Sequence, residues 1–143
     1  MIYLVSPYSH PDPAVRDRRY LAACRTTVHL LLAGRSVFSP IVHGHPLVAF
    51  GLPPDWSFWA RHDGAHLRRC DQVLVLPVDR WRESQCVQAE IELAQRLGIP
   101  VSYAQERDVA PVSPPEGHDA QRAHLAPERD VGQRGALEKK DHP

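Results

Sequence analysis

One acidic residue, Glu90, lies on a predicted helix face that is otherwise apolar. Residues 84–98 carry apolar side chains at helical spacing, and the positions predicted to face inward are Val87, Ile91, Ala94 and Leu97. Glu90 shares or borders that face, whereas its neighbour Glu92 points toward solvent. A carboxylate at the edge of a core loses hydration, which is unfavourable unless it has a partner or a chemical task. Glu90 is therefore either a functional acid or a boundary residue whose methylene groups pack while its carboxylate reaches water.

A second acid, Asp63, faces the apolar side of another predicted helix. This helix runs from about residue 57 to residue 70, and one side of it carries Trp59, Asp63, Leu67 and Cys70. The alternative is a structural carboxylate paired with a nearby basic side chain, for which the candidates are Arg61, His62, His66 and Arg68.

Two further groups of polar residues follow predicted strands. Ser6, Tyr8 and Ser9 come after the first strand, where proline keeps the chain out of helix and leaves their hydroxyls available, unless this is an ordinary polar turn. His43 and His45 follow the second strand. We expect no metal there, because no third ligand stands at a recognisable spacing. The two histidines either line a pocket as hydrogen-bond donors or shape a turn.

Ser84 begins the helix that carries Glu90. It is a natural N-cap, and the free amides of the first helical turn beside it favour an anion, with Arg80 and Arg82 close in sequence. Ser84 either only caps the helix or also contacts a ligand. Six residues of helix place Glu90 about 9 Å further along the axis. An anion at Ser84 and the carboxylate of Glu90 would therefore bracket a group of the size of a ribose.

The elements that must position these residues alternate along the chain. Four short apolar runs are predicted strands, at residues 2–5, 36–39, 72–76 and 101–103. A long helix is predicted between Asp12 and Gly34, with an inward face made of Leu21, Cys24, Val28, Leu31 and Leu32. This alternation predicts an α/β fold: a small parallel sheet of four to five strands with helices on both faces, flavodoxin-like or Rossmann-like. Ligands bind such sheets at the carboxyl ends of the strands, which carry the polar groups described above.

Composition limits the functional classes. The 143 residues include 17 basic and 17 acidic side chains, so no charge excess indicates a nucleic acid polymer or a membrane surface as partner. No apolar run has the length of a membrane span. The N-terminal segment predicts a strand rather than a signal peptide. The cysteines are odd in number and lack CxxC spacing, which indicates a cytoplasmic protein. Residues 1–104 are predicted to form one domain. Residues 105–143 lack aromatic residues and are predicted to be a disordered tail.

Several segments together resemble a known enzyme superfamily. These are the strand leading into Ser6-Pro7-Tyr8, residues 34–40, the stretch from Trp59 through Asp63 to Leu76, and Ser84 followed by Ala89-Glu90-Ile91 and the segment up to Val101. This pattern resembles the nucleoside 2-deoxyribosyltransferase superfamily, and within it a branch of small bacterial proteins of the DUF1937 type.

The resemblance implies roles for individual residues. It implies that Glu90 is the nucleophile that attacks the anomeric carbon, that Tyr8 positions Glu90, and that Asp63 is the acid or base near the nucleobase. A serine six residues before the glutamate, here Ser84, is similar to the branch that hydrolyses nucleoside 5′-monophosphates, where it binds phosphate. Ser6, Ser9, His43 and His45 are additional substrate-binding candidates. The resemblance also implies a homo-oligomer, and neither a metal nor an organic cofactor.

The expected function is cleavage of the N-glycosidic bond of a nucleoside 5′-monophosphate or a nucleoside, by hydrolysis or by deoxyribosyl transfer. The alternative is a non-catalytic nucleotide-binding module on the same fold. A third possibility is a structural or partner-binding domain, which predicts no saturable nucleotide binding.

Overall fold

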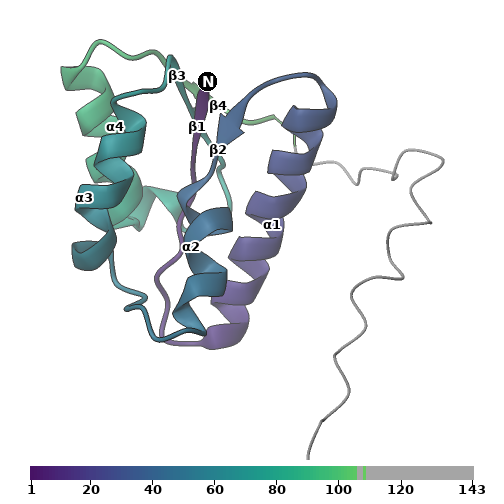
Figure 1. The fold of residues 1–143 in the computed structure, drawn as a ribbon, viewed down its shortest axis with the longest axis vertical. Helices are drawn as coiled ribbons and strands as arrows, with labels where there is room; N and C mark the ends of the chain where they lie inside the picture. Colours follow the sequence, from purple (N-terminus) through teal and green to yellow (C-terminus); the bar gives the residue numbers. More distant parts are fainter. Residues whose placement is uncertain (106–107, 109–143) are drawn as a thin grey trace, which may run out of the picture. The chain divides into compact units, whose positions relative to one another are not determined.

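A four-stranded parallel sheet forms the centre of the fold (Figure 1). The computed structural model describes residues 1–105 and residue 108, all of which lie in the first of the chain's two structural units, Met1–Val112. The strands are β1 (Ile2–Val5), β2 (Val37–Phe38), β3 (Gln72–Val75) and β4 (Val101–Tyr103), in the order β2-β1-β3-β4. The central strand β1 pairs with β2 on one side and β3 on the other, and the order reverses between these neighbours.

Helices cover both faces of the sheet, which confirms the predicted fold class. Helices α1 (Pro13–Leu32) and α2 (Pro40–Val48) lie on one side, while α3 (Trp56–Leu67) and α4 (Gln85–Arg96) lie on the other (Figure 1). A single 3-10 turn, η1 (Trp81–Glu83), precedes α4. The order of the strands is that of a doubly wound sheet, whose ligand site is expected at the carboxyl ends of the strands on either side of the reversal.

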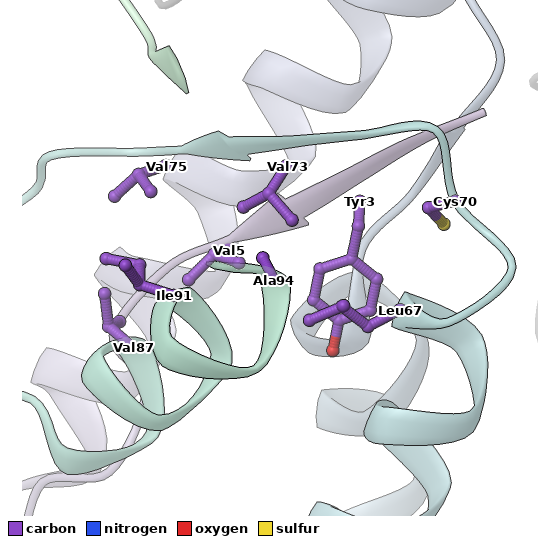
Figure 2. Close-up of a cluster of buried hydrophobic side chains, with 9 residues drawn as sticks. All are labelled: Tyr3, Val5, Leu67, Cys70, Val73, Val75, Val87, Ile91 and Ala94. Carbon is purple, nitrogen blue, oxygen red and sulfur yellow. The ribbon is translucent and has the colours of Figure 1, made fainter. Parts of the chain in front are cut away.

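Alternate residues of the buried strands supply the two halves of the core. Tyr3 and Val5 face α3 and α4, whereas Ile2 and Leu4 face α1 and α2. Figure 2 shows the first half, in which the Tyr3 ring extends from β1 toward Leu67, with its hydroxyl at the end away from the strands. The other members of this cluster are Cys70, Val73, Val75, Val87, Ile91 and Ala94. A tyrosine with no exposed surface therefore carries its hydroxyl to the far side of an apolar layer.

Helix α2 was not predicted, because its sequence contains the residues that usually mark turns. Gly44 and Pro46 lie within it, and the sequence interpretation placed the histidines in a loop. Two local features start the helix: Ser39 accepts a hydrogen bond from the Val42 amide at 3.3 Å, and Pro40 occupies the first turn. Gly44 packs against the Trp59 ring, and a Cβ there would lie 3.4 Å from that ring, which is ordinary van der Waals contact.

The Ser39 cap gives a prediction for stability. Replacing Ser39 by alanine removes a buried capping hydroxyl and is expected to lower the free energy of unfolding by about 1 kcal/mol. Chemical denaturation measures this change. Ser36→Ala is the matched control, because Ser36 is exposed and precedes the strand rather than the helix, and its effect is expected to be close to zero. Equal effects of the two substitutions would mean that the cap contributes nothing to α2.

Helix α1 faces the sheet with a different side from the one predicted. Its fully or nearly buried residues are Arg19, Ala23, Thr26 and Leu30. Four of the five residues predicted to face inward are about half exposed: Leu21, Val28, Leu31 and Leu32. Two of these residues, Ala23 and Thr26, are small, and the Thr26 hydroxyl is satisfied by donating to the Ala22 carbonyl at 3.1 Å. Periodicity indicated the helix correctly but not the face that packs.

Leu97, also predicted to face inward, is 44% exposed after the end of α4.

The remaining predicted elements lie close to the observed ones. Strands β1 and β4 match the predicted residues, β3 ends one residue earlier and β2 is shorter. In the part of the chain described here, none of the helices combines the length and hydrophobicity needed to cross a bilayer. The predicted disordered tail, residues 105–143, lies outside the described residues except for residues 105 and 108.

Candidate active site

A pocket at the carboxyl ends of the strands brings together most of the predicted site residues. We call it the carboxylate pocket. Its lining includes Glu90, Asp63, Tyr8, Ser6, Ser9 and His45. The other lining side chains are largely apolar and come from α2, α3 and the segment between them: Pro40, Ile41, Gly44, Val48, Pro54, Trp56 and Trp59, with Cys86 from α4. The cavity has a volume of about 50 Å³, which corresponds to a few water molecules.

Glu90 is buried in this pocket and is held by a tyrosine of the central strand. Only 5% of Glu90 is exposed, and its Oε1 accepts a hydrogen bond from the Tyr3 hydroxyl at 2.7 Å. Burial raises the pKa of Glu90 to about 8; the Tyr3 hydrogen bond acts in the opposite direction, and the charge of Asp63 raises the value further. Burial, together with the contact to Glu90, raises the pKa of Tyr3 well above its ordinary value, so the phenol stays protonated and donates.

Asp63 is the second buried carboxyl group of the pocket. It is 4% exposed, and its Oδ1 lies 3.1 Å from Nδ1 of His62, an adjacent and more exposed residue of α3. Burial raises the pKa of Asp63, while the hydrogen bond to His62 and the nearby charges of His62, His66 and His43 act to lower it. Asp63 is thus in contact with a histidine, as the structural alternative required, and it also lines the pocket.

Tyr8 lies in the pocket, but its hydroxyl contacts a histidine rather than Glu90. The Tyr8 hydroxyl is 2.9 Å from Nδ1 of His45, whose ring stacks on Tyr20 with 4.0 Å between ring centroids. On its other side, Nε2 of His45 is 3.7 Å from Oδ1 of the exposed Asp17. The tyrosine that touches Glu90 is Tyr3, for which the sequence interpretation had assigned no role.

The other two predicted residues lie outside the carboxylate pocket. His43 is exposed on α2 and stacks against His62, with 5.3 Å between ring centroids. Ser84 lines a second hollow, which we call the anion pocket. Its volume is about 290 Å³, and its lining consists of Ser9, His10, Arg19, Trp56, Arg80, Glu83, Ser84, Gln85 and Cys86. The two pockets adjoin, because Ser9, Trp56 and Cys86 line both.

Ser84 stands at the N-cap position of α4 without capping it. Its hydroxyl lies 3.1 Å from the Cys86 sulfur and makes no hydrogen bond to the first turn. Cys86 and Arg19 are further pocket residues that sequence reasoning missed. For Cys86 the available signal was its position one turn before Glu90 on the same helix. Arg19 gave no signal, because an arginine within a helical segment is usually exposed.

The described residues contain no group of three or more histidine, cysteine, aspartate or glutamate side chains arranged to hold a metal ion.

The comparison with protein families found a match over most of the chain. The sequence model of the family described as "Domain of unknown function (DUF1937)" matches residues 1–106, about three quarters of the chain. The chain belongs to the DUF1937 family. The comparison with curated proteins gave no match.

In this DUF1937 domain, the pocket combines two buried carboxyl groups with a largely apolar wall. Burial raises the pKa of both carboxyl groups, and the charge of Asp63 also raises the pKa of Glu90. Two neighbouring acids of this kind can share protons, so that one acts as a carboxylate while the other acts as a carboxylic acid. A cation that develops beside an ionised carboxylate of the pocket would be attracted more strongly than in water, because the dielectric constant here is low.

Proposed function

We propose that this protein cleaves the N-glycosidic bond of a nucleoside or a nucleoside 5′-monophosphate, with Glu90 as the nucleophile. The observation that carries the proposal is the pair formed by Glu90 and Asp63, two acids 5% and 4% exposed that line one pocket. The resemblance to the nucleoside 2-deoxyribosyltransferase superfamily supports the same roles. Breaking an N-glycosidic bond develops positive charge on the sugar, which a desolvated carboxylate can stabilise or capture.

The proposed reaction proceeds in two steps. The Glu90 carboxylate forms a bond to the anomeric carbon while the bond to the base breaks, and Asp63 donates its proton to the departing base. Water or a second base then takes the sugar from Glu90, and Asp63 accepts a proton from that nucleophile. Because the cavity holds only a few waters, a whole nucleoside requires the pocket to widen. In this proposal the wall segment 49–55, which is neither helix nor strand and carries Pro54, moves to admit the substrate.

The test is release of free base from a panel of ribo- and deoxyribonucleosides and their 5′-monophosphates, measured by chromatography. Wild type is expected to release base from at least one of them, and Glu90→Gln is expected to release none. Glu92→Gln is the matched control, because Glu92 is the exposed glutamate of the same helix. No release by wild type, with a nucleotide still raising the melting temperature, would replace the proposal by the non-catalytic nucleotide-binding module. Absence of both effects would reject both functions.

The hydrogen bond from Tyr3 gives a prediction for the rate. Tyr3→Phe removes the donor to Glu90 Oε1, and the rate of base release is expected to fall about tenfold, the value of one hydrogen bond to a charged group. The same loss raises the pKa of Glu90, so the part of the pH–rate profile governed by Glu90 is expected to move to higher pH. Rates measured across pH with a saturating substrate separate the two effects.

Tyr8→Phe is the control for this experiment. Its hydroxyl contacts His45, so its removal is expected to leave the Glu90-dependent part of the pH profile in place. The opposite pattern, with a shift for Tyr8→Phe and none for Tyr3→Phe, would give the positioning role to Tyr8, as the resemblance implies.

A further inference from the structure

A half-exposed histidine of α3 contacts the buried carboxyl group of Asp63. Nδ1 of His62 lies 3.1 Å from Oδ1 of Asp63, and the His62 side chain is 40% exposed whereas that of Asp63 is 6% exposed. In the described part of the chain, Oδ1 of Asp63 has this one hydrogen-bond partner and Oδ2 has none. Asp63 also lines the carboxylate pocket. The two oxygens of this carboxyl group are therefore not equivalent.

Neighbouring rings hold the His62 imidazole in place. The ring of His43 from α2 lies nearly parallel to it, with 5.3 Å between centroids, and the ring of Trp59 meets it edge-on at 5.7 Å. The His66 ring, one helical turn further along α3, lies 4.4 Å away, and Nδ1 of His66 is 3.0 Å from the His62 carbonyl. Because a carbonyl oxygen only accepts, Nδ1 of His66 is the donor of that bond. These contacts restrict the direction in which His62 presents its own Nδ1.

The contact between His62 and Asp63 allows two positions of the hydrogen atom, with opposite consequences. If Asp63 donated from Oδ1 to a bare Nδ1, its proton would be held away from a ligand. If His62 donates from Nδ1, a proton on Asp63 sits on Oδ2, from which it can pass to a ligand in the pocket. Donation by His62 also favours the ionised form of Asp63, because an N–H bond to a carboxylate is charge-assisted. In agreement with this, the hydrogen bond to His62 lowers the pKa of Asp63 against the effect of burial.

We propose that His62 is a positioning residue for the acid Asp63: it donates from Nδ1 to Oδ1 and stabilises the carboxylate that forms when Asp63 gives up its proton. The inference rests on the proposed function, in which the Oδ2 proton moves to the departing base while the electron pair of the glycosidic bond stays on that base. In this step Asp63 changes from a neutral acid to an anion at a buried site, where desolvation disfavours charge. A donor that already points at the developing anion lowers the barrier, because no group has to reorient.

The position of the proton and its effect on Asp63 can be measured without a substrate. In nitrogen-15 NMR spectra of the full chain at about pH 9, Nδ1 of His62 is expected to carry a proton, and its signal is assigned by its loss in His62→Asn. Carbon-13 NMR of the Asp63 carboxyl group then follows its titration. His62→Leu removes the donor, so the pKa of Asp63 is expected to rise. His62→Asn keeps an N–H near the position of Nδ1, so its titration is expected to stay close to that of wild type. The other titratable groups that face Asp63 are the same in all these proteins: Tyr3, His43, His66 and Glu90.

Base release gives the functional measurement. With ordinary nucleobases, kcat of His62→Leu at its optimal pH is expected to fall about 10- to 100-fold, the value of one hydrogen bond to a charged group, and that of His62→Asn less than about threefold. With a leaving group that departs without a proton, the loss is expected to be less than about twofold in either variant. His29→Leu is the matched control, because His29 lies in the last turn of α1 and lines neither pocket, and it is expected to have no effect.

Each measurement has an outcome that would overturn the inference. A bare Nδ1 in wild type, or an Asp63 titration that His62→Leu leaves unchanged, would mean that His62 does not donate to Asp63. An equal loss of rate with both leaving groups would make His62 a residue that only stabilises the fold. The wild-type spectrum and His62→Asn decide the donor even where His62→Leu fails to fold. Both NMR results as expected, without base release by wild type from any substrate, would keep the hydrogen bond but reject the glycosidase and the role of His62 in it.

Discussion

Replacing Glu90 by glutamine is expected to stabilise the protein above pH 8 and to leave its stability almost unchanged below pH 4.5. The pKa of Glu90 is about 8 in the folded protein, against an ordinary value of 4.5. Between these values the folded state holds a proton that the unfolded state has released, so the free energy of unfolding of wild type falls as the pH rises. Glutamine carries no such proton and can still accept the hydrogen bond from Tyr3, so the variant avoids this loss.

The size of the effect follows from the separation of the two pKa values. By linkage, the wild-type protein loses about 3–5 kcal/mol across this window, which is a large part of the stability of a small domain. Below pH 4.5 the carboxyl is neutral in both states, and above pH 8 it is ionised in both, so the difference between the proteins changes only in between. Urea denaturation of wild type and variant at intervals from pH 4 to pH 9.5 measures this difference.

Glu92→Gln is again the matched control, since the Glu92 side chain is 67% exposed. Its stability curve is expected to run parallel to that of wild type over the whole range. If the curve of Glu90→Gln also ran parallel, Glu90 would be ionised in the folded protein at neutral pH. Its burial would then not control its protonation, and the argument for a shared proton in the pocket would be lost. This measurement needs no substrate, so it tests the site independently of the proposed reaction.

The two acids of the site could be predicted from the sequence because each interrupts an otherwise apolar helix face. Their burial confirms the predicted position of both: Glu90 lies with Val87, Ile91 and Ala94 on the buried side of α4, and Asp63 lies near Leu67 on that of α3. The strands were predictable for a related reason, since short apolar runs between helices are typical of a parallel sheet buried on both faces. These signals are local, and each depends on a single element.

The contacts that complete the site are not local. Tyr3 lies on β1 and Tyr8 in the loop that follows it, but only the packing of α4 against the sheet decides that the Tyr3 hydroxyl reaches Glu90. Tyr8 meets His45 because His45 lies on α2. The sequence did not predict that helix, since Gly44 and Pro46 are residues that usually mark turns. For α1, the sequence has apolar residues on the exposed side and Arg19 on the buried side, the reverse of what periodicity favours. Tertiary packing overrides the local pattern at these positions.

Replacing Asp63 by asparagine is expected to slow base release from ordinary nucleobases by about 100- to 1000-fold, the usual contribution of a general acid. A substrate whose leaving group departs without protonation is expected to lose less than about tenfold, because Glu90 attacks it unaided. The two substrates differ only in their need for the Asp63 proton, so each is the control for the other. Parallel measurements of kcat for wild type and Asp63→Asn provide the comparison.

The pH dependence of the same variant identifies which acid holds the proton. With an ordinary base as the leaving group, the wild-type reaction needs one proton on the pair of Glu90 and Asp63. Its rate is therefore expected to fall at high pH, as Glu90 ionises near pH 8. With the activated leaving group, the rate is instead expected to rise toward pH 8 and stay high, because only the Glu90 carboxylate is needed. Asp63→Asn removes the charge that raises the pKa of Glu90, so this rise is expected to move to lower pH, opposite to the shift in Tyr3→Phe. An equal loss of rate with both substrates, without a shift, would make Asp63 a structural partner of His62 rather than the acid of the reaction.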